Sequence, residues 1–142
     1  MTEITDASGN PITEGANIGR FVRDTGFATW NRYAAVNDEF VPIHMDDAAG
    51  AEAGMGGAFG MGNLQLSYLH NLVRSWMGDG GRILKLAAQF RKPNTKGVVI
   101  ASGRVTSVTP SAGGVTVELE LETIDAAGDR LAPASATVVF AS

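Results

Sequence analysis

Carboxylates and a histidine gather within ten residues of the chain, in the segment 37–46, which reads NDEFVPIHMD. Histidine and carboxylate side chains are the usual general acids and bases of enzymes, since both exchange protons readily in water. Pro42 fixes its own backbone φ and biases Val41 towards extended geometry, so the segment is a shaped loop and not a regular helix or strand. The segment is either an irregular connection or holds a catalytic acid–base pair, a carboxylate and His44, at a fixed spacing.

The composition of the 142-residue chain favours one globular cytoplasmic domain, with 44% hydrophobic and 18% charged residues. The net charge is −4, and the densest basic spot, Arg91-Lys92, is too small for a nucleic-acid footprint. The chain has no cysteine and only two histidines, His44 and His70, which gives no metal signature. The amino terminus lacks the order of a secretion signal, and no apolar run reaches the roughly 20 residues of a membrane span. We therefore expect no nucleic acid, membrane or metal partner.

The elements that must position the loop follow from hydrophobic periodicity. A short helix over 29–37, with Thr29 as its N-cap, is expected before the loop, and a longer helix over 63–78 after it. The apolar side chains of the longer helix cover too wide an arc for a surface helix, so it is expected to be buried, with Gly78 ending it. Extended segments are expected at 18–26, 83–91, 98–108, 115–123 and 131–140.

The last four extended segments are joined by the turn-forming sequences NTKG, SAGG and DAAGD, which predict an antiparallel meander. In the segment 115–123, valine and leucine alternate with threonine and glutamate, so one face of the sheet is apolar. An apolar sheet face and a buried helix must cover each other. We therefore expect an α+β fold: a single domain over 18–142 whose antiparallel sheet wraps around a long central helix, preceded by a flexible tail over 1–17.

The stretch 50–62 holds six glycines between the loop and the long helix. It contains no GxGxxG and no Lys-Ser or Lys-Thr after the glycines, so it is not a phosphate-binding loop. A flexible linker is one interpretation, although alanine, methionine and phenylalanine are untypical of linkers. We favour glycines that let the backbone approach a ligand or another element closely.

The segment 33–46 resembles a hallmark of the MaoC-like dehydratases, which include the (R)-specific enoyl-CoA hydratases and have the hot-dog fold. That hallmark runs Tyr-Ala-x-x-Ser-Gly-Asp-x-Asn-Pro-Ile-His-x-Asp. The residues that match it, without a gap, are Tyr33, Ala34, Pro42, Ile43, His44 and Asp46. Further matches are Ala58, Gly60 and Met61 at the start of the long helix and FRKPNTKG (90–97) at a strand end. The resemblance thus covers nearly the whole chain after residue 18.

Five positions depart from the family pattern. Ser-Gly-Asp is replaced by Asn37-Asp38-Glu39, so Glu39 stands at the position of the family's catalytic aspartate. Val41 replaces the following asparagine, and Phe59 replaces the histidine before the helix glycine. Asp38 has the family's residue type one position early, and it is the alternative acid–base residue.

The resemblance implies a hydratase or dehydratase of fatty acid metabolism, a lyase that reversibly adds water to a trans-2-enoyl-CoA and gives an (R)-3-hydroxyacyl-CoA. Glu39 and His44 would hold one water and move its protons, and the backbone N–H of Gly60 would stabilise charge on the thioester oxygen. No cofactor is expected, because coenzyme A is part of the substrate and the thioester itself acidifies the neighbouring carbon.

Further substrate contacts are assigned to Phe59, and to Arg91 and Lys92 with the phosphates of coenzyme A. A solvated strand end is the alternative for the two basic residues, and tight packing is the alternative for Gly60. Two other functions stay open: a hot-dog acyl-CoA thioesterase and a non-catalytic acyl-CoA-binding subunit of a heteromeric hydratase. Because a single hot-dog sheet leaves an unpaired edge strand, we expect a homodimer or a hot-dog heterodimer.

Overall fold

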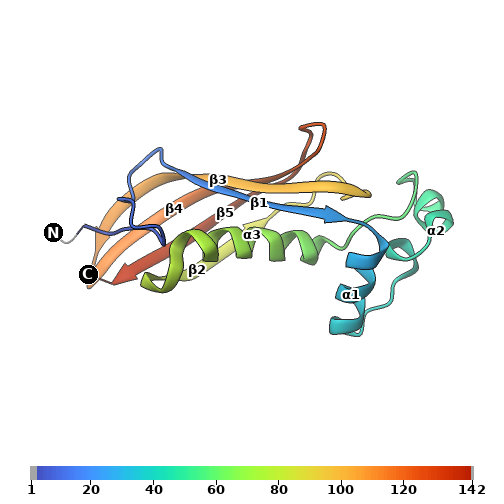
Figure 1. The fold of residues 1–142 in the computed structure, drawn as a ribbon, viewed down its shortest axis with the longest axis horizontal. Coiled ribbons are helices and arrows are strands. Elements are labelled where there is room, and N and C mark those ends of the chain that lie inside the picture. The colour runs from blue at the N-terminus through green and yellow to red at the C-terminus, as the bar shows by residue number, and fades with distance from the viewer. Residues whose placement is uncertain (1–2, 142) are drawn as a thin grey trace.

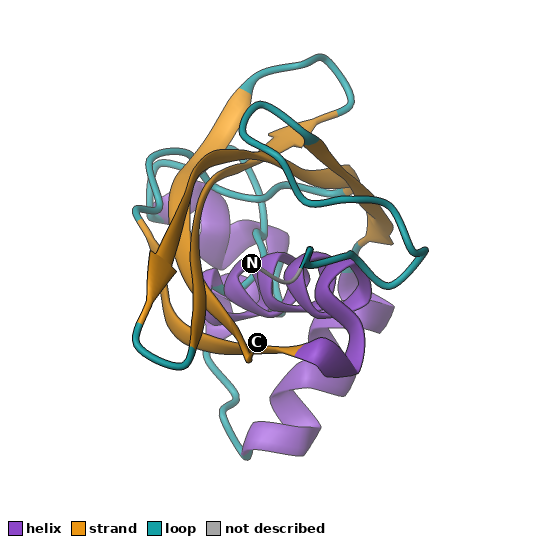
Figure 2. Ribbon diagram, turned by 90° about the vertical axis from the view of Figure 1, so that its left-hand side faces the viewer, coloured by secondary structure: helices purple, strands orange, loops and turns teal. Residues whose placement is uncertain are grey.

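The computed structural model describes residues 3–141 and contains one curved antiparallel sheet that wraps around a long helix (Figures 1 and 2). The strands are β1 (Asn17–Thr25), β2 (Gly81–Ala88), β3 (Gly97–Ser111), β4 (Gly114–Asp125) and β5 (Arg130–Ala141). The helices are α1 (Phe27–Asn37), α2 (Asp47–Glu52) and α3 (Gly62–Met77), with 3₁₀ turns η1 (Pro42–His44) and η2 (Gly78–Gly80). This is the single α+β domain that the sequence predicts.

Helix α3 fills the concave side of the sheet because its apolar residues point towards the strands from most of its circumference. Leu69 and Val73 are fully buried, as are Val117 of β4 and Val138 of β5. Each such side chain contributes about 1.5–3 kcal/mol through its removal from water. The helix ends where expected, at Gly78, whose φ of 67° lies in the left-handed region that favours glycine.

Strand β4 shows the predicted alternation most clearly. Its valines and leucines are at most 3% exposed, and they are Val115, Val117, Leu119 and Leu121. One buried polar pair joins this sheet face to the helix: the Thr123 hydroxyl donates to Gln65 Oε1 at 2.7 Å. The pair satisfies two groups that would otherwise destabilise the apolar interior.

The sheet order corrects the predicted meander. The strands run β1-β3-β4-β5-β2, so β2 pairs with β5 and lies on the opposite edge from β1. Strands β3, β4 and β5 do form a meander, but the segment 89–96 carries the chain from one side of the sheet to the other. The short NTKG sequence suggested a hairpin between β2 and β3. The sheet must enclose α3, however, and β2, which directly follows α3, pairs with β5 at the free edge of the sheet.

Two local expectations also differ from the structure. Helix α1 begins at Phe27 after the N-cap Gly26, so Thr29 lies inside the helix and is not its cap. Residues 3–16, expected to be a loose tail, lie against the domain: the Ala7 N–H donates to the Trp76 carbonyl at 2.8 Å, and Ile12 is buried. The apolar Ile4 and Ile12 in a mostly polar segment are the sequence signal for this contact.

Candidate functional site

The site is built on three connecting segments at one end of α3: the loop after α1, the glycine-rich stretch before α3, and the segment 89–96. In Figure 1, α1 and α2 lie beyond the N-terminal end of α3, away from most of the sheet. Backbone hydrogen bonds join these segments, since the Phe59 N–H donates to the Ile43 carbonyl at 3.2 Å and the Gly60 N–H to the Asn94 carbonyl at 2.7 Å. The three segments therefore form one connected unit.

His44 is the most firmly held of the predicted catalytic residues. It ends the η1 turn that Pro42 begins, and its side chain is only 9% exposed. Its Nδ1 lies 2.6 Å from the Phe59 carbonyl oxygen. The imidazole ring packs edge-to-face against the Phe59 ring, with 5.2 Å between the ring centroids. A carbonyl oxygen only accepts hydrogen bonds, so Nδ1 carries the proton. In the neutral ring, Nε2 then has a free lone pair and is able to accept a proton from water.

Glu39 is the opposite case, because its side chain is exposed and nothing among residues 3–141 is hydrogen-bonded to its carboxylate. Its backbone is fixed all the same. The N–H groups of Asp38 and Glu39 both donate to the Ala34 carbonyl and close the end of α1. The backbone of Glu39 is therefore held in place, whereas no hydrogen bond or ion pair within residues 3–141 holds its carboxylate.

Asp38, the alternative acid–base residue, has a structural role that explains its position. It is the C-cap of α1, with φ 52° and ψ 44° in the left-handed region. Aspartate tolerates this conformation better than most residues, and the helix ends there because the chain reverses direction. This backbone role accounts for an aspartate at position 38 without any chemistry.

The resemblance placed Gly60 at the start of the long helix. In the structure α3 begins two residues later, at Gly62. The Gly60 N–H has no partner within the helix, but the Asn94 carbonyl occupies it at 2.7 Å. A Cβ on Gly60 would lie 2.6 Å from Trp30 Nε1 and 2.8 Å from Asn94 Nδ2. Glycine is therefore needed here for packing, whatever its part in chemistry.

Close backbone approach explains a second glycine of the 50–62 stretch, as the sequence favoured. A Cβ on Gly50 of α2 would overlap the Gly57 carbonyl group. Phe90 likewise lies over Gly62, where a Cβ would be 2.8 Å from the ring. The glycines therefore bring backbone and side chains together at the start of α3, which a flexible linker would not do.

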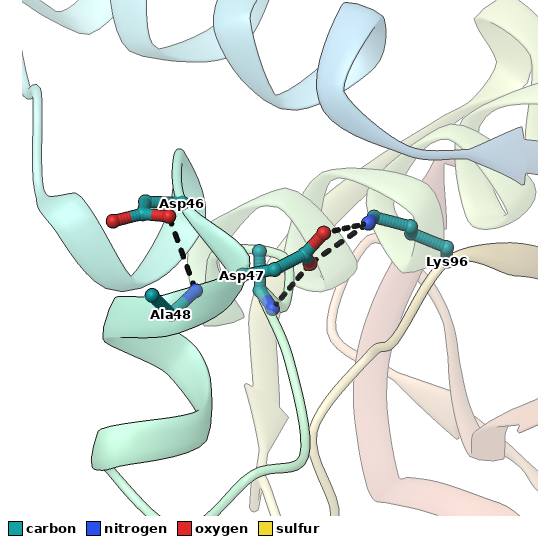
Figure 3. A network of polar contacts seen from close by, with 5 residues as sticks. Asp46, Asp47, Ala48 and Lys96 are labelled. Carbon is teal, nitrogen blue, oxygen red and sulfur yellow. Dashed lines mark hydrogen bonds and ion pairs between the residues drawn. The ribbon is translucent and has the colours of Figure 1, made fainter.

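Two carboxylates after His44 fix the loop to its neighbours (Figure 3). Asp46 caps α2, accepting from the Ala48 N–H at 3.1 Å. Asp47 accepts from the Ala58 N–H at 3.0 Å and from Lys96 Nζ at 2.8 and 2.7 Å. The Lys96 ammonium and then the Ala58 N–H hold the pKa of Asp47 below its ordinary value.

Sequence reasoning missed the parts played by Asp47, Lys96 and Asn94. Asp47 and Lys96 are 49 residues apart, and Lys96 Nζ also lies 4.2 Å above the Phe27 ring. The only local signal was a lysine and an asparagine inside the turn sequence NTKG. Their partners are set by the path of the segment 89–96, which no local pattern reveals.

Of the proposed substrate-binding residues, only Phe59 packs within this connected unit. Phe59 is half-buried against His44. Arg91 and Lys92 are exposed, their N–H groups donate to the Leu131 carbonyl, and the Arg91 side chain donates to Gln89 Oε1 at 2.6 Å.

Among the described residues, no three histidine, aspartate or glutamate side chains gather as a metal site would require. No described helix is long and apolar enough to cross a membrane.

Neither a protein-family model nor a curated protein matches the sequence. Solved structures do match it. The (R)-hydratase from A. caviae involved in PHA biosynthesis has a TM-score of 0.80 at 22% identity, over 89% of this chain and 96% of that chain. The MaoC-like dehydratase from Rhodospirillum rubrum has a TM-score of 0.78 at 18% identity, over 92% and 94%. The ChsH1-ChsH2 complex from Mycobacterium tuberculosis has a TM-score of 0.79 at 17% identity, over 90% and 98%. The chain thus has the hot-dog fold of the R-hydratases and MaoC-like dehydratases, as predicted.

Proposed function

We propose that the protein is a hydratase or dehydratase that adds water to the double bond of a trans-2-enoyl-CoA, or removes it from the (R)-3-hydroxyacyl-CoA. The observation that carries this proposal is the state of His44. The histidine is buried, its Nδ1 proton is held by the Phe59 carbonyl at 2.6 Å, and its Nε2 is left as the basic nitrogen. A base of fixed tautomer and orientation suits general acid–base catalysis.

In the hydration direction, Glu39 and His44 hold one water beside the double bond. One of the two side chains takes a proton from the water as its oxygen bonds to C3. Electron density moves through C2 onto the thioester oxygen, and the proton is then delivered to C2, so that atoms and charge balance. Elimination is the same path in reverse.

Charge on the thioester oxygen requires hydrogen-bond donors near the start of α3. The Gly60 N–H can donate to the thioester oxygen only if the substrate displaces the Asn94 carbonyl from it. The N–H groups of Gly62 and Asn63, in the first turn of α3, have no acceptor among residues 3–141. They also lie at the positive end of the helix dipole, and we place the oxyanion donors in this group of three.

A second candidate function is a non-catalytic acyl-CoA-binding subunit in a heteromeric hydratase. Two observations favour it: the Glu39 carboxylate is free in solvent, and the Gly60 N–H is already engaged. The similarity to the ChsH1-ChsH2 complex, whose name gives two components, is compatible with this alternative.

Purified protein assayed with crotonyl-CoA and with a longer enoyl-CoA decides between these functions. We expect loss of the conjugated double bond without release of free thiol. Thiol release instead would indicate a thioesterase. No change in either signal, with enoyl-CoA still bound in an equilibrium assay, would support the binding subunit and contradict the hydratase.

A further inference from the structure

One peptide group connects His44 to a buried residue on another segment of the site. The carbonyl of Phe59 and the N–H of Gly60 belong to the same planar peptide unit, and they point in opposite directions. The carbonyl accepts from His44 Nδ1 at 2.6 Å, and the N–H donates to the Asn94 carbonyl at 2.7 Å. A chain of hydrogen bonds therefore runs from the His44 ring through one peptide unit to Asn94.

Hydrogen bonds in such a chain strengthen one another. A peptide N–H that donates leaves the carbonyl oxygen of its own peptide unit more negative, and that oxygen becomes a better acceptor where water is excluded. Water is largely excluded here, since Asn94 is 1% exposed and His44 is 9% exposed. The Asn94 carbonyl therefore strengthens the bond that keeps the proton on His44 Nδ1 and the lone pair on Nε2.

The position of the Asn94 carbonyl is fixed by the end of β1. Thr25, the last residue of that strand, pairs with Gly97. Its buried hydroxyl lies 2.7 Å from the Gly97 carbonyl oxygen and 3.2 Å from Asn94 Oδ1. These contacts join the turn 94–97 to the sheet, so the carbonyl that accepts from Gly60 is held by the most rigid part of the fold.

Two buried donors beside Gly60 point to the same role for Asn94. Trp30 Nε1 and Asn94 Nδ2 have no hydrogen-bond partner among residues 3–141, and each lies within 2.8 Å of the point that a Cβ of Gly60 would occupy. Buried donors rarely stay unpaired in folded proteins. A half-turn of the Asn94 amide would place Oδ1 on the side of the Trp30 N–H and let Nδ2 donate to the Thr25 hydroxyl. The side chain would then connect α1 to β1.

We propose that Asn94 is a positioning residue for His44, which acts through the 59–60 peptide unit. The Gly60 N–H takes part in this chain of hydrogen bonds and does not contact the substrate. Of the donors considered for the thioester oxygen, those of Gly62 and Asn63 then remain. The effect on turnover rests on the proposed function, whereas the effect on the His44 ring does not.

The His44 ring reports this effect in the free protein. A long-range proton–nitrogen NMR spectrum distinguishes a protonated ring nitrogen from a bare one, and the exposed His70 is the only other histidine and the internal reference. At about pH 8.5, where free histidine is neutral, wild-type His44 should carry its proton on Nδ1. In Asn94→Ala, which loses the side-chain contacts, the ratio of Nδ1–H to Nε2–H should fall by about threefold to tenfold, as expected for one hydrogen bond.

Two buried threonines supply matched variants. Thr25→Val removes the hydroxyl that holds the turn 94–97 and should shift the tautomer ratio in the same direction as Asn94→Ala, and Thr25→Ser should restore it. Thr123→Val removes a buried hydroxyl that donates to Gln65 Oε1 at 2.7 Å in the core, and it should leave the ratio unchanged. Circular dichroism checks the fold of each variant, and the Thr25 variants give the answer if Asn94→Ala does not fold.

Steady-state kinetics with crotonyl-CoA extend the test to turnover. Asn94→Ala and Thr25→Val should lower kcat by about threefold to tenfold and change KM by less than about twofold, because they disturb the base and not the binding of substrate. Thr123→Val should change neither. An inactive wild type would contradict the proposed function, and the tautomer measurement would still decide the role of Asn94.

The proposal is overturned if wild-type His44 carries its proton on Nε2, or if folded Asn94→Ala and Thr25→Val keep the wild-type tautomer ratio. It is also overturned if Thr123→Val changes that ratio as much as they do. A loss of kcat at an unchanged tautomer ratio has the same meaning, since Asn94 would then act by a route other than the His44 ring.

Discussion

His44 and Glu39 are five residues apart in the chain, yet the structure holds them in very different ways. His44 is buried and bonded through Nδ1 to the Phe59 carbonyl at 2.6 Å. Glu39 is exposed, and its carboxylate has no partner among the described residues. The difference arises because His44 closes a turn that packs against the segment before α3, whereas Glu39 follows the reversal at Asp38.

This contrast indicates that only half of the proposed acid–base pair is preorganised. A buried residue with a fixed partner loses little freedom when substrate arrives, while an exposed glutamate must be ordered by the substrate or by a docked chain. The comparison therefore predicts large effects at His44, somewhat smaller ones at Glu39, and effects on stability at the residues that support His44.

Replacing His44 by glutamine should have the largest effect. Glutamine keeps a hydrogen-bond donor near the Phe59 carbonyl but cannot accept a proton, so hydration of crotonyl-CoA should fall by about 10²–10⁴-fold. Steady-state kinetics measure the loss. His70→Gln is the control, since His70 is exposed on α3, and it should leave the rate nearly unchanged. Equal losses in both variants would contradict a special role for His44.

Exchanging the two neighbouring carboxylates tests the other half of the pair. Glu39→Gln should remove most activity, towards the lower end of the same about 10²–10⁴-fold range, because its carboxylate is not preorganised. Asp38→Asn should keep most activity, since asparagine also tolerates the left-handed conformation at φ 52°. The reverse result would move the acid–base role to Asp38. If the wild type shows no hydration activity and neither substitution changes that, the binding subunit is favoured.

Adding one methyl group at Gly60 should loosen the support of His44. The Cβ of Gly60→Ala would lie 2.6 Å from Trp30 Nε1, so the free energy of unfolding should fall by about 1–3 kcal/mol. Urea denaturation followed by circular dichroism measures this change. Gly80→Ala, where the nearest atom would be 3.8 Å away, should change stability far less. Equal stability of the two variants would show that the segment before α3 shifts to admit the methyl group at little cost in free energy.

The Asp47–Lys96 pair should have the smallest effect, visible only in acid. Since the folded-state pKa of Asp47 lies below its ordinary value of 3.8, its stabilisation is present above that value and is lost as pH falls through the lowered pKa. Asp47→Asn should therefore flatten part of the acid limb of the stability profile, measured by urea midpoints from neutral pH down to about pH 3. Lys96→Gln should act alike, and Lys85→Gln, an exposed lysine without an ion pair, should not. An unchanged acid limb in both pair variants would mean that solvent screens the interaction completely.

Several features of the fold were predictable because they depend on periodicity or on a local motif. The alternation in β4 identified its buried residues, and the wide apolar arc of α3 identified a helix enclosed by a sheet. The N-cap at Asp46 and the turn at Pro42 follow from residue type and immediate neighbours alone. The Asp38 reversal was not predicted, although an aspartate at a helix end is a suitable residue for it.

The sequence by itself determined the α+β class and the central helix, because hydrophobic periodicity is a local property of each segment. It also determined the candidacy of Glu39 and His44, because their positions match a family pattern within one short segment. Only the tertiary structure decided that β2 joins the far edge beside β5, and that the Asn94 carbonyl takes the Gly60 N–H. It also decided that Lys96 reaches Asp47 across 49 residues. These outcomes depend on how the sheet closes around α3, and hydrogen bonds between distant segments form only once that closure has set their separation in space.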